Sequence, residues 1–271
     1  MSPIYVPGKV TLRQTWQPMD PDAAAYITAV ETTDGQALEE KVKIAIDNFV
    51  LGCKADGIWG AIKASCILAG ARTLSGALVP LVGAEPTKNG TEGGWNYNRK
   101  TGLQGNGTDN YIDSGRSYTA DPQNNFHLSV LVSTAHQSSE TVGMYIGGQG
   151  TDSNHCNDIY RFGSDLYFRN RSTNASIGTG AGAQTGFLGS SRSASASFTR
   201  RYNSVNAAIS ENSVALSTSQ DLFVFARNLN GTPNALSSGR LAFYSIGESL
   251  DLARLDARVT DLINAFGVAI P

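Results

Sequence analysis

Glycine and proline punctuate the chain from Leu74 onward, and this spacing constrains the fold more than any other sequence feature. Gly76, Pro80, Gly83 and Pro86 begin the series, and the later segments between turns are short and rich in alternating or β-branched residues. These segments predict strands at residues 107–113, 126–134, 142–147, 158–162, 165–170, 198–203, 207–210, 221–228 and 241–247. Short strands separated by turns, with no helical periodicity among them, predict an antiparallel β-sandwich rather than βαβ units.

Helical patterns flank this region on both sides. Asp20-Pro21-Asp22 combines a capping carboxylate with proline in the first turn, and predicts a short helix to about Glu31. Two further helices are predicted, one ending at Gly52 and one between residues 56 and 70. Their apolar stripes comprise Leu38, Val42, Ala45, Ile46 and Phe49, and then Trp59, Ile62, Cys66 and Ala69. After the last strand, an amphipathic helix is predicted at residues 249–266, with Gly267 as its stop.

The first 19 residues predict an extended arm. Pro3, Pro7 and Pro18 oppose helix formation, while apolar side chains recur between them. The side chains expected to contact a partner are Ile4, Tyr5, Val6, Leu12 and Trp16. The chain is therefore expected to comprise an extended N-terminal arm (1–19), a helical anchoring segment (20–73) and a β-sandwich with a C-terminal helix (74–271).

Composition argues against several classes of protein. The formal net charge is −2 and no cationic run exceeds Arg200-Arg201, so nucleic acid is not an expected partner. The longest apolar stretches are too short to span a membrane, and the N-terminus lacks the pattern of a secretory signal. The three cysteines form no CxxC pair, which favours buried thiols over disulfides. We therefore expect a soluble protein made in a cytoplasm.

Catalytic patterns are not recognisable in the sequence. Glycosidases on sandwich folds set carboxylates at alternate positions of one strand, and no Glu-x-Asp-x-Glu pattern occurs here. His127, His136 and His155 are too widely spaced to indicate a triad or a zinc site. The glycine-rich run at 178–183 lacks the flanking strand and acid of a dinucleotide fingerprint. The sequence predicts no enzyme activity and no cofactor.

Two groups of residues remain as binding candidates. Asp152, Asn154 and Asp158 belong to the densest oxygen-rich segment and are weak Ca²⁺ candidates, with a polar hairpin loop as the alternative. Aromatic residues near predicted loops could stack on sugars, with core packing as the alternative. The aromatic candidates for carbohydrate are Trp95, Tyr97 and Tyr118, together with Tyr111 and Tyr160.

Three segments resemble the concanavalin A-like jelly roll of laminin-G-like and legume-lectin-like domains. GNGTDNYI at 105–112 is similar to an early strand of that family, and FHLSVLV at 126–132 to the core strand that follows. GRLAFYSIG at 239–247, followed by a helix with Leu255, Val259 and Leu262, is similar to the closing strand and terminal helix. The resemblance implies a jelly-roll β-sandwich and leaves function open.

A narrower resemblance is to virion proteins of tailed bacteriophages, including cyanophages. It is carried by FVLGCKADGIW at 49–59 leading to GARTL at 70–74, by NRKTGL at 98–103 and by ADPQN at 120–124. The resemblance implies a component of the phage particle, in the head or in the tail.

Two functional hypotheses follow. The first is a capsid decoration or cement protein at the virion surface, a homotrimer whose arm and helices grip the major capsid protein or other virion proteins. The alternative is a tail-fibre or spike module that binds host-surface glycans. The absence of a long coiled-coil or β-helical shaft in this chain favours the first hypothesis.

Overall fold

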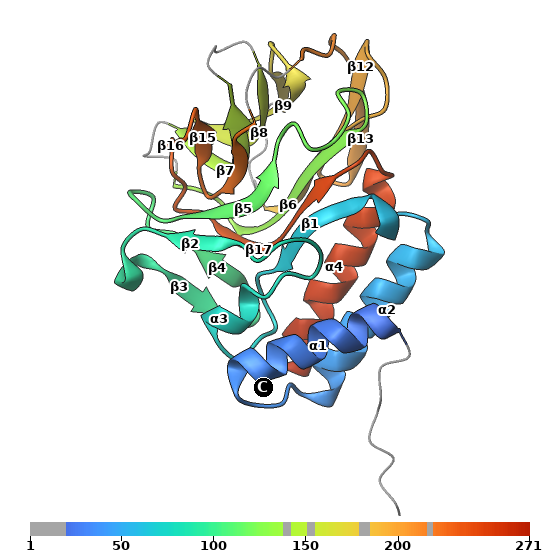
Figure 1. Cartoon of the computed structure of the whole chain (residues 1–271), viewed down its shortest axis with the longest axis vertical. Helices are drawn as coiled ribbons and strands as arrows, with labels where there is room; N and C mark the ends of the chain where they lie inside the picture. Colours follow the sequence, from blue (N-terminus) through green and yellow to red (C-terminus); the bar gives the residue numbers. More distant parts are fainter. Residues whose placement is uncertain (1–19, 138–141, 151–154, 179–184, 216–218) are drawn as a thin grey trace, which may run out of the picture.

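The computed structural model describes residues 20–137, 142–150, 155–178, 185–215 and 219–271, and they form three layers (Figure 1). Two mostly antiparallel sheets face each other, and three helices cover the outer side of one of them. We call the sheet under the helices the covered sheet and the other the open sheet. The mainly β sandwich predicted from the sequence is confirmed.

The covered sheet has eight strands among the described residues, in the order β13-β12-β11-β6-β17-β4-β3, with β1 also paired to β17. Their bounds are β1 (Ile62–Ile67), β3 (Asn96–Asn98), β4 (Gly102–Gln104), β6 (Phe126–Thr134), β11 (Gly186–Arg192), β12 (Ser197–Tyr202), β13 (Val205–Ser210) and β17 (Arg240–Gly247).

The open sheet has nine described strands, in the order β10-β9-β8-β7-β14-β5-β2, with the β15–β16 hairpin attached to β7. Their bounds are β2 (Thr87–Asn89), β5 (Tyr111–Ser117), β7 (Val142–Gln149), β8 (Cys156–Phe162), β9 (Asp165–Ser172), β10 (Ser176–Gly178), β14 (Asp221–Val224), β15 (Arg227–Leu229) and β16 (Thr232–Asn234).

The helices are α1 (Pro21–Asp34), α2 (Glu40–Ala55), the short α3 (Leu74–Ala77) and α4 (Leu252–Ala269), with single 3₁₀ turns η1 (Trp59–Ala61) and η2 (Glu92–Gly94). Asp20 caps α1 by accepting from the backbone N–H groups of Asp22 and Ala23. Asp251 caps α4 in the same way. The predicted stop of α4 at Gly267 is wrong, because the helix continues to Ala269.

Side-chain alternation along the central strands separates two apolar cores. On β6, Leu128, Val130 and Val132 lie between the two sheets, whereas Leu131 points to the helices. On β17, Phe243 also points to the helices and meets Phe49 of α2 edge-to-face, with ring centroids 5.8 Å apart. Burying each such side chain contributes about 1.5–3 kcal/mol, so the helical layer stabilises the covered sheet directly.

The third helix predicted at residues 56–70 is wrong, because most of that segment is η1 and β1. Ala64, Cys66 and Leu68 lie in the core between the sheets, while Ile67 and Ala69 lie in the core under the helices. The strand is therefore buried on both faces, and its period of two is hidden within a continuous apolar run.

Ion pairs also join the helical segment to the rest of the protein. Glu39 binds Arg99 in a bidentate pair with N–O distances of 3.0 and 2.7 Å, and it pairs with Arg72 at 2.9 Å. At the end of α2, Asp56 accepts from Arg258 of α4 at 2.7 Å. Residues 20–73 and 74–271, expected as separate units, thus share a core and a set of ion pairs.

Eight of the nine predicted strands coincide with observed ones to within four residues at each end, and the predicted strand at 221–228 is divided into β14 and β15. β11 was not predicted, although it pairs with β6 over its whole length. Its sequence, GFLGSSR, buries Ser190 and Arg192 in place of apolar residues and so shows no alternation. None of the described helices is both long and apolar enough to span a bilayer.

Candidate functional site

The outer side of β8 and β9 is the candidate binding surface, because α1, α2 and α4 lie on the opposite side of the sandwich (Figure 1). Ile159 of β8 and Phe168 of β9 point into the core between the sheets. Alternation therefore places Tyr160 and Tyr167 on the outer side. The two strands form one hairpin, in which Tyr160 and Tyr167 are directly paired.

Three aromatic side chains gather on this surface, and we call Tyr160, Phe162 and Tyr167 the aromatic strip. The Tyr160 and Tyr167 rings stack with centroids 4.8 Å apart and planes within 10° of each other. Phe162 meets Tyr167 edge-to-face and is 48% exposed. Both tyrosines are half-buried. The strip is thus a packed aromatic cluster, in which the two tyrosine rings cover one face of each other and Phe162 is the most exposed ring.

Arg169 and Asp158 brace the strip from one side. Arg169 Nε and Nη2 donate to the two carboxylate oxygens of Asp158 at 2.9 and 2.6 Å, and its guanidinium lies 5.5 Å from the centre of the Tyr160 ring. Burial first, and then the nearby Asp158 carboxylate, raise the pKa of Tyr160 to about 12. The phenol of Tyr160 therefore stays protonated and able to donate at neutral pH.

A second outward group lies on β5 and β14 of the same sheet. The rings of Tyr111 and Phe223 are 4.6 Å apart, and the side chains of Asp113 and Asp221 are hydrogen-bonded to each other. Burial and the neighbouring Asp113 raise the pKa of Asp221.

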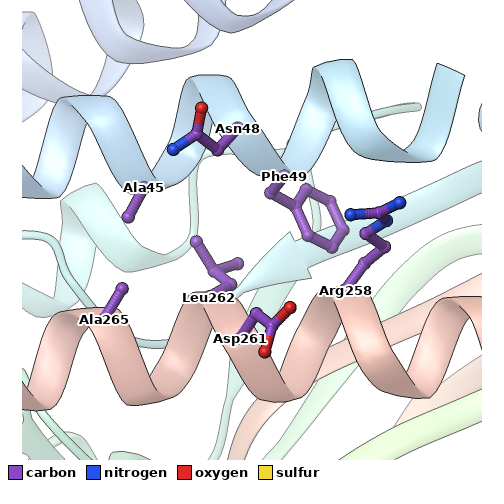
Figure 2. Close-up of a pocket in the computed structure, with 7 residues that line it drawn as sticks. All are labelled: Ala45, Asn48, Phe49, Arg258, Asp261, Leu262 and Ala265. Atoms are coloured by element: carbon purple, nitrogen blue, oxygen red, sulfur yellow. The ribbon is translucent and has the colours of Figure 1, made fainter. Parts of the chain in front are cut away.

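A groove between α2 and α4 has a volume of about 240 Å³ (Figure 2). Asn48 and Phe49 line it from α2, and Asp261 and Leu262 line it from α4. Arg258 lies near Phe49 in Figure 2, and its guanidinium is held by Asp56. Arg258, the one basic residue that lines the groove, is already paired with Asp56. We therefore assign the groove to the packing of α2 against α4.

The aromatic residues named from the sequence as carbohydrate candidates differ in exposure: some are buried, and others lie on the outer side of the open sheet. Tyr118 is fully buried in the core between the sheets, so its assignment to a sugar site is wrong. Tyr97 is largely buried and donates its hydroxyl to the Ala71 carbonyl at 2.8 Å. Trp95 packs edge-to-face on Phe225 at 5.5 Å. Tyr111 and Tyr160, in contrast, lie half-exposed on the outer side of the open sheet.

The candidate metal ligands are not brought together as a described site. Asp158 is fully buried, and its carboxylate is occupied by Arg169. Asp152 and Asn154 lie outside the described residues, as do the arm residues Ile4, Tyr5, Val6, Leu12 and Trp16. Within the described part of the chain, no three His, Cys, Asp or Glu side chains are grouped to hold a metal ion.

The histidines and cysteines are mostly interior. His127 is fully buried, and its Nδ1 donates to the Glu248 carbonyl at 2.5 Å while Nε2 contacts Ser245 Oγ at 2.7 Å. Burial lowers the pKa of His127 to about 4. Cys53, Cys66 and Cys156 are all free and buried, which confirms the sequence expectation of interior thiols.

Sequence reasoning missed Phe162, Tyr167 and Arg169 as residues of one surface cluster. A signal for them exists, because DIYRF at 158–162 and DLYFRN at 165–170 are two alternating strands joined by a two-residue turn. Reading the hairpin register would have paired Tyr160 with Tyr167.

No protein-family model matches this sequence, and no curated protein matches it either. Among solved structures, the receptor binding domain of botulinum neurotoxin C/D mosaic serotype is similar, with a TM-score of 0.51 and 8% identity over 74% of this chain and 51% of that chain. A CBM40 of Ruminococcus gnavus IT-sialidase, bound to alpha2,3 sialyllactose, matches with a TM-score of 0.40 and 11% identity, covering 54% of this chain and 91% of that one.

The present chain spans about half the length of the toxin chains and about a quarter of the NanB sialidase chains that it also matches. At these identities the likeness concerns the fold alone. The jelly-roll β-sandwich with a C-terminal helix, expected from the sequence, is confirmed.

Proposed function

We propose that the protein is a non-catalytic binding module of a virus particle, and that the outer side of its open sheet binds carbohydrate. The observation that carries the proposal is the division of the sandwich into two unlike sides. Helices cover one sheet, whereas the other presents the aromatic strip to solvent.

The chemistry of the strip suits a sugar. Carbohydrates offer apolar C–H faces that stack on aromatic rings, and hydroxyls that need directional hydrogen bonds. Tyr160, Phe162 and Tyr167 hold one another in place, so little side-chain entropy is lost when a ligand packs against them. Among the described contacts, Arg169 uses Nε and Nη2 for Asp158, which leaves Nη1 to donate to a ligand oxygen.

The test is a glycan array followed by titration of the best ligand into soluble full-length protein. Tyr167→Ala is expected to weaken binding by about tenfold or more, since stacking on one ring contributes on the order of 1–2 kcal/mol. Val205→Ala is the matched control, because Val205 is 62% exposed on β13 of the covered sheet. Equal affinity of Tyr167→Ala and wild type for the glycan would contradict the proposal that the aromatic strip binds carbohydrate.

A second candidate function is capsid decoration by a homotrimer, with the arm gripping the major capsid protein or another virion protein. It is favoured by the position of Asp20, where the arm joins: α1 lies in the helical layer, on the opposite side of the sandwich from β8 and β9 (Figure 1). Attachment through one side would leave the aromatic strip displayed.

Copy number on purified particles separates the two candidates. A copy number that follows the capsid lattice supports decoration, whereas a small number located at one vertex supports a tail module. The molar mass of the isolated protein tests the trimer independently, and a monomer at high concentration would contradict it.

A further inference from the structure

A groove of about 360 Å³ runs along the exposed side of α1. One wall is formed by Ala25, Tyr26 and Ala29 of that helix, and the other by Trp59, Leu81 and Val82. Its volume lies at the lower end of the ~300–1,000 Å³ range of ligand pockets. Asp22 lies at one end of the groove, and the other lining side chains are apolar or aromatic.

The groove is held open by contacts at its mouth. Trp59 Nε1 donates to Asp22 at 3.1 Å, and the Lys54 ammonium lies 5.7 Å from the centre of the Trp59 ring. Lys54 in turn binds Asp20 and Asp22 at 2.8 and 2.7 Å. The large indole is therefore fixed as a wall, and the small Ala25 and Ala29 opposite it leave the space between them.

We propose that this groove holds the apolar part of the arm of its own chain, with Trp16 as the main anchor. The arm joins the described structure at Asp20, immediately beside the mouth of the groove. Trp16 precedes Asp20 by four residues, so an extended chain lets it reach about 13 Å from that point. The groove spans Asp22 to Ala29, or about 10 Å of helix.

The sequence of the arm fits the groove in pattern and in charge. Val10, Leu12 and Trp16 are separated by even numbers of residues, so an extended segment presents them on one face. Lys9 and Arg13 are the only charged residues among the first 19, whereas α1 contains Asp22, Glu31 and Asp34 and no base. Asp22 and Glu31 are already paired with Lys54 and Lys43, so the basic residues of the arm add a small electrostatic contribution, and the apolar anchor carries the proposal.

Docking within one chain also has a concentration advantage. A short tether raises the effective concentration of Trp16 near its groove to the millimolar range, which a second copy reaches only at high protein concentration. The proposal does not depend on the carbohydrate site. It leaves Ile4, Tyr5 and Val6, which lie beyond the reach of the groove, as the part of the arm available to a partner.

The experiment is native-state trypsin digestion of the full chain, because Lys9 and Arg13 place two cleavage sites within the arm. Trp16→Ala should remove the anchor, and Ala29→Glu should fill the groove with a charge. Each variant is expected to be cleaved in the arm at least tenfold faster than wild type. Thr28→Glu is the matched control, since Thr28 is an exposed neighbour on α1 that does not line the groove.

Protein concentration distinguishes the occupants. A protected arm in a monomer, with a cleavage rate independent of concentration, supports docking within one chain. Protection that grows with concentration and accompanies a larger molar mass would assign the groove to the arm of a second copy and overturn the proposal. Equal cleavage rates in wild type and Ala29→Glu would overturn it as well, provided that circular dichroism shows both to be folded.

Discussion

Arg192 is the largest fully buried side chain of the described structure, and it neutralises no carboxylate there. Its Nε donates to the Asn170 carbonyl at 2.8 Å, and Nη1 lies within 3.0–3.2 Å of four further carbonyls. Those four belong to Ala194, Ser195, Ser197 and Glu211. One buried guanidinium thereby joins carbonyls of β9, of the loop after β11, of the start of β12 and of the residue after β13.

Replacing Arg192 with Met is expected to lower the free energy of unfolding by about 3–5 kcal/mol, because it leaves several buried carbonyls without a donor. Urea denaturation measures the change. Arg254→Met is the control, since the Arg254 side chain is 54% exposed. Equal losses from the two substitutions would mean that the carbonyl cluster contributes little.

His127 should make stability depend on pH. Burial lowers its pKa from 6.5 to about 4, so below pH 6.5 the unfolded chain binds a proton that the folded chain refuses. The contribution of His127 is therefore complete above pH 6.5 and is lost as the pH falls towards 4, by about 3 kcal/mol in total.

Denaturation of wild type and His127→Gln across this pH range tests the prediction. The substituted protein is expected to be less stable at neutral pH, because it loses the paired contacts to Glu248 and Ser245. Its stability should fall less steeply between pH 6.5 and 4. Parallel pH profiles for the two proteins would assign the acid sensitivity to other groups.

At the scale of elements, Glu39 ties the start of α2 to the segment before β4. The hydrogen bonds from Arg99 lower the pKa of Glu39, although burial opposes them. Because the pKa of Glu39 is lower in the folded protein, its stabilising contribution is present above pH 4.5, the pKa in the unfolded chain. The contribution disappears as the pH falls through the pKa of Glu39 in the folded protein.

Glu39→Gln is expected to reduce stability by about 1–2 kcal/mol at pH 7, a modest figure because solvent screens part of the pair. Thermal unfolding at pH 7 and at a pH below the folded pKa gives the comparison, and the difference from wild type should shrink at the acidic pH. Glu40→Gln serves as control, because Glu40 is the exposed next residue.

The elements that could be predicted from the sequence are those with one solvent-exposed face and one buried face. β6 was predicted with its observed bounds, and α4 within three residues at each end, because their apolar residues recur at the period of the element. β1 was missed because both of its faces are apolar, and β11 because Ser190 and Arg192 occupy interior positions. Hydrophobic periodicity does not reveal a strand that is buried on both faces, or one whose interior positions hold polar side chains.

The candidate site was predictable in part, for the same reason. Tyr160 could be named as an aromatic residue near a loop, but its stacking on Tyr167 depends on hairpin register. Tyr118 shows the opposite error, since tertiary packing rather than its position near a loop decides its burial. The arm residues lie outside the described structure, and their role as partner contacts stays a prediction.

At the scale of the whole molecule, the shared core predicts one cooperative unfolding transition. Phe49 of α2, Phe243 of β17 and Leu255 of α4 belong to one cluster that joins the helical layer to the covered sheet, and the other face of that sheet packs on the open sheet. Loss of the helices would expose the outer side of the covered sheet, so the sheet should not persist without them.

Thermal unfolding followed by far-ultraviolet circular dichroism and by tryptophan fluorescence is therefore expected to give coincident midpoints. Trp59 reports from the helical side and Trp95 from the region next to Phe225. Two separate midpoints would indicate that residues 20–73 melt independently, as the division into separate units first suggested.

The pairing of β1 with β17 also has a consequence for biosynthesis. Cys66 and Tyr244, which face each other in that pair, are 178 residues apart. At ~5–20 residues per second, a ribosome needs about 10–35 s to deliver the second strand after the first. Throughout that interval β1 is an apolar segment without its partner, so the nascent chain should depend on holding chaperones. A gene shortened from its 3′ end would likewise encode β1 without β17. Its product should aggregate rather than fold into a smaller domain.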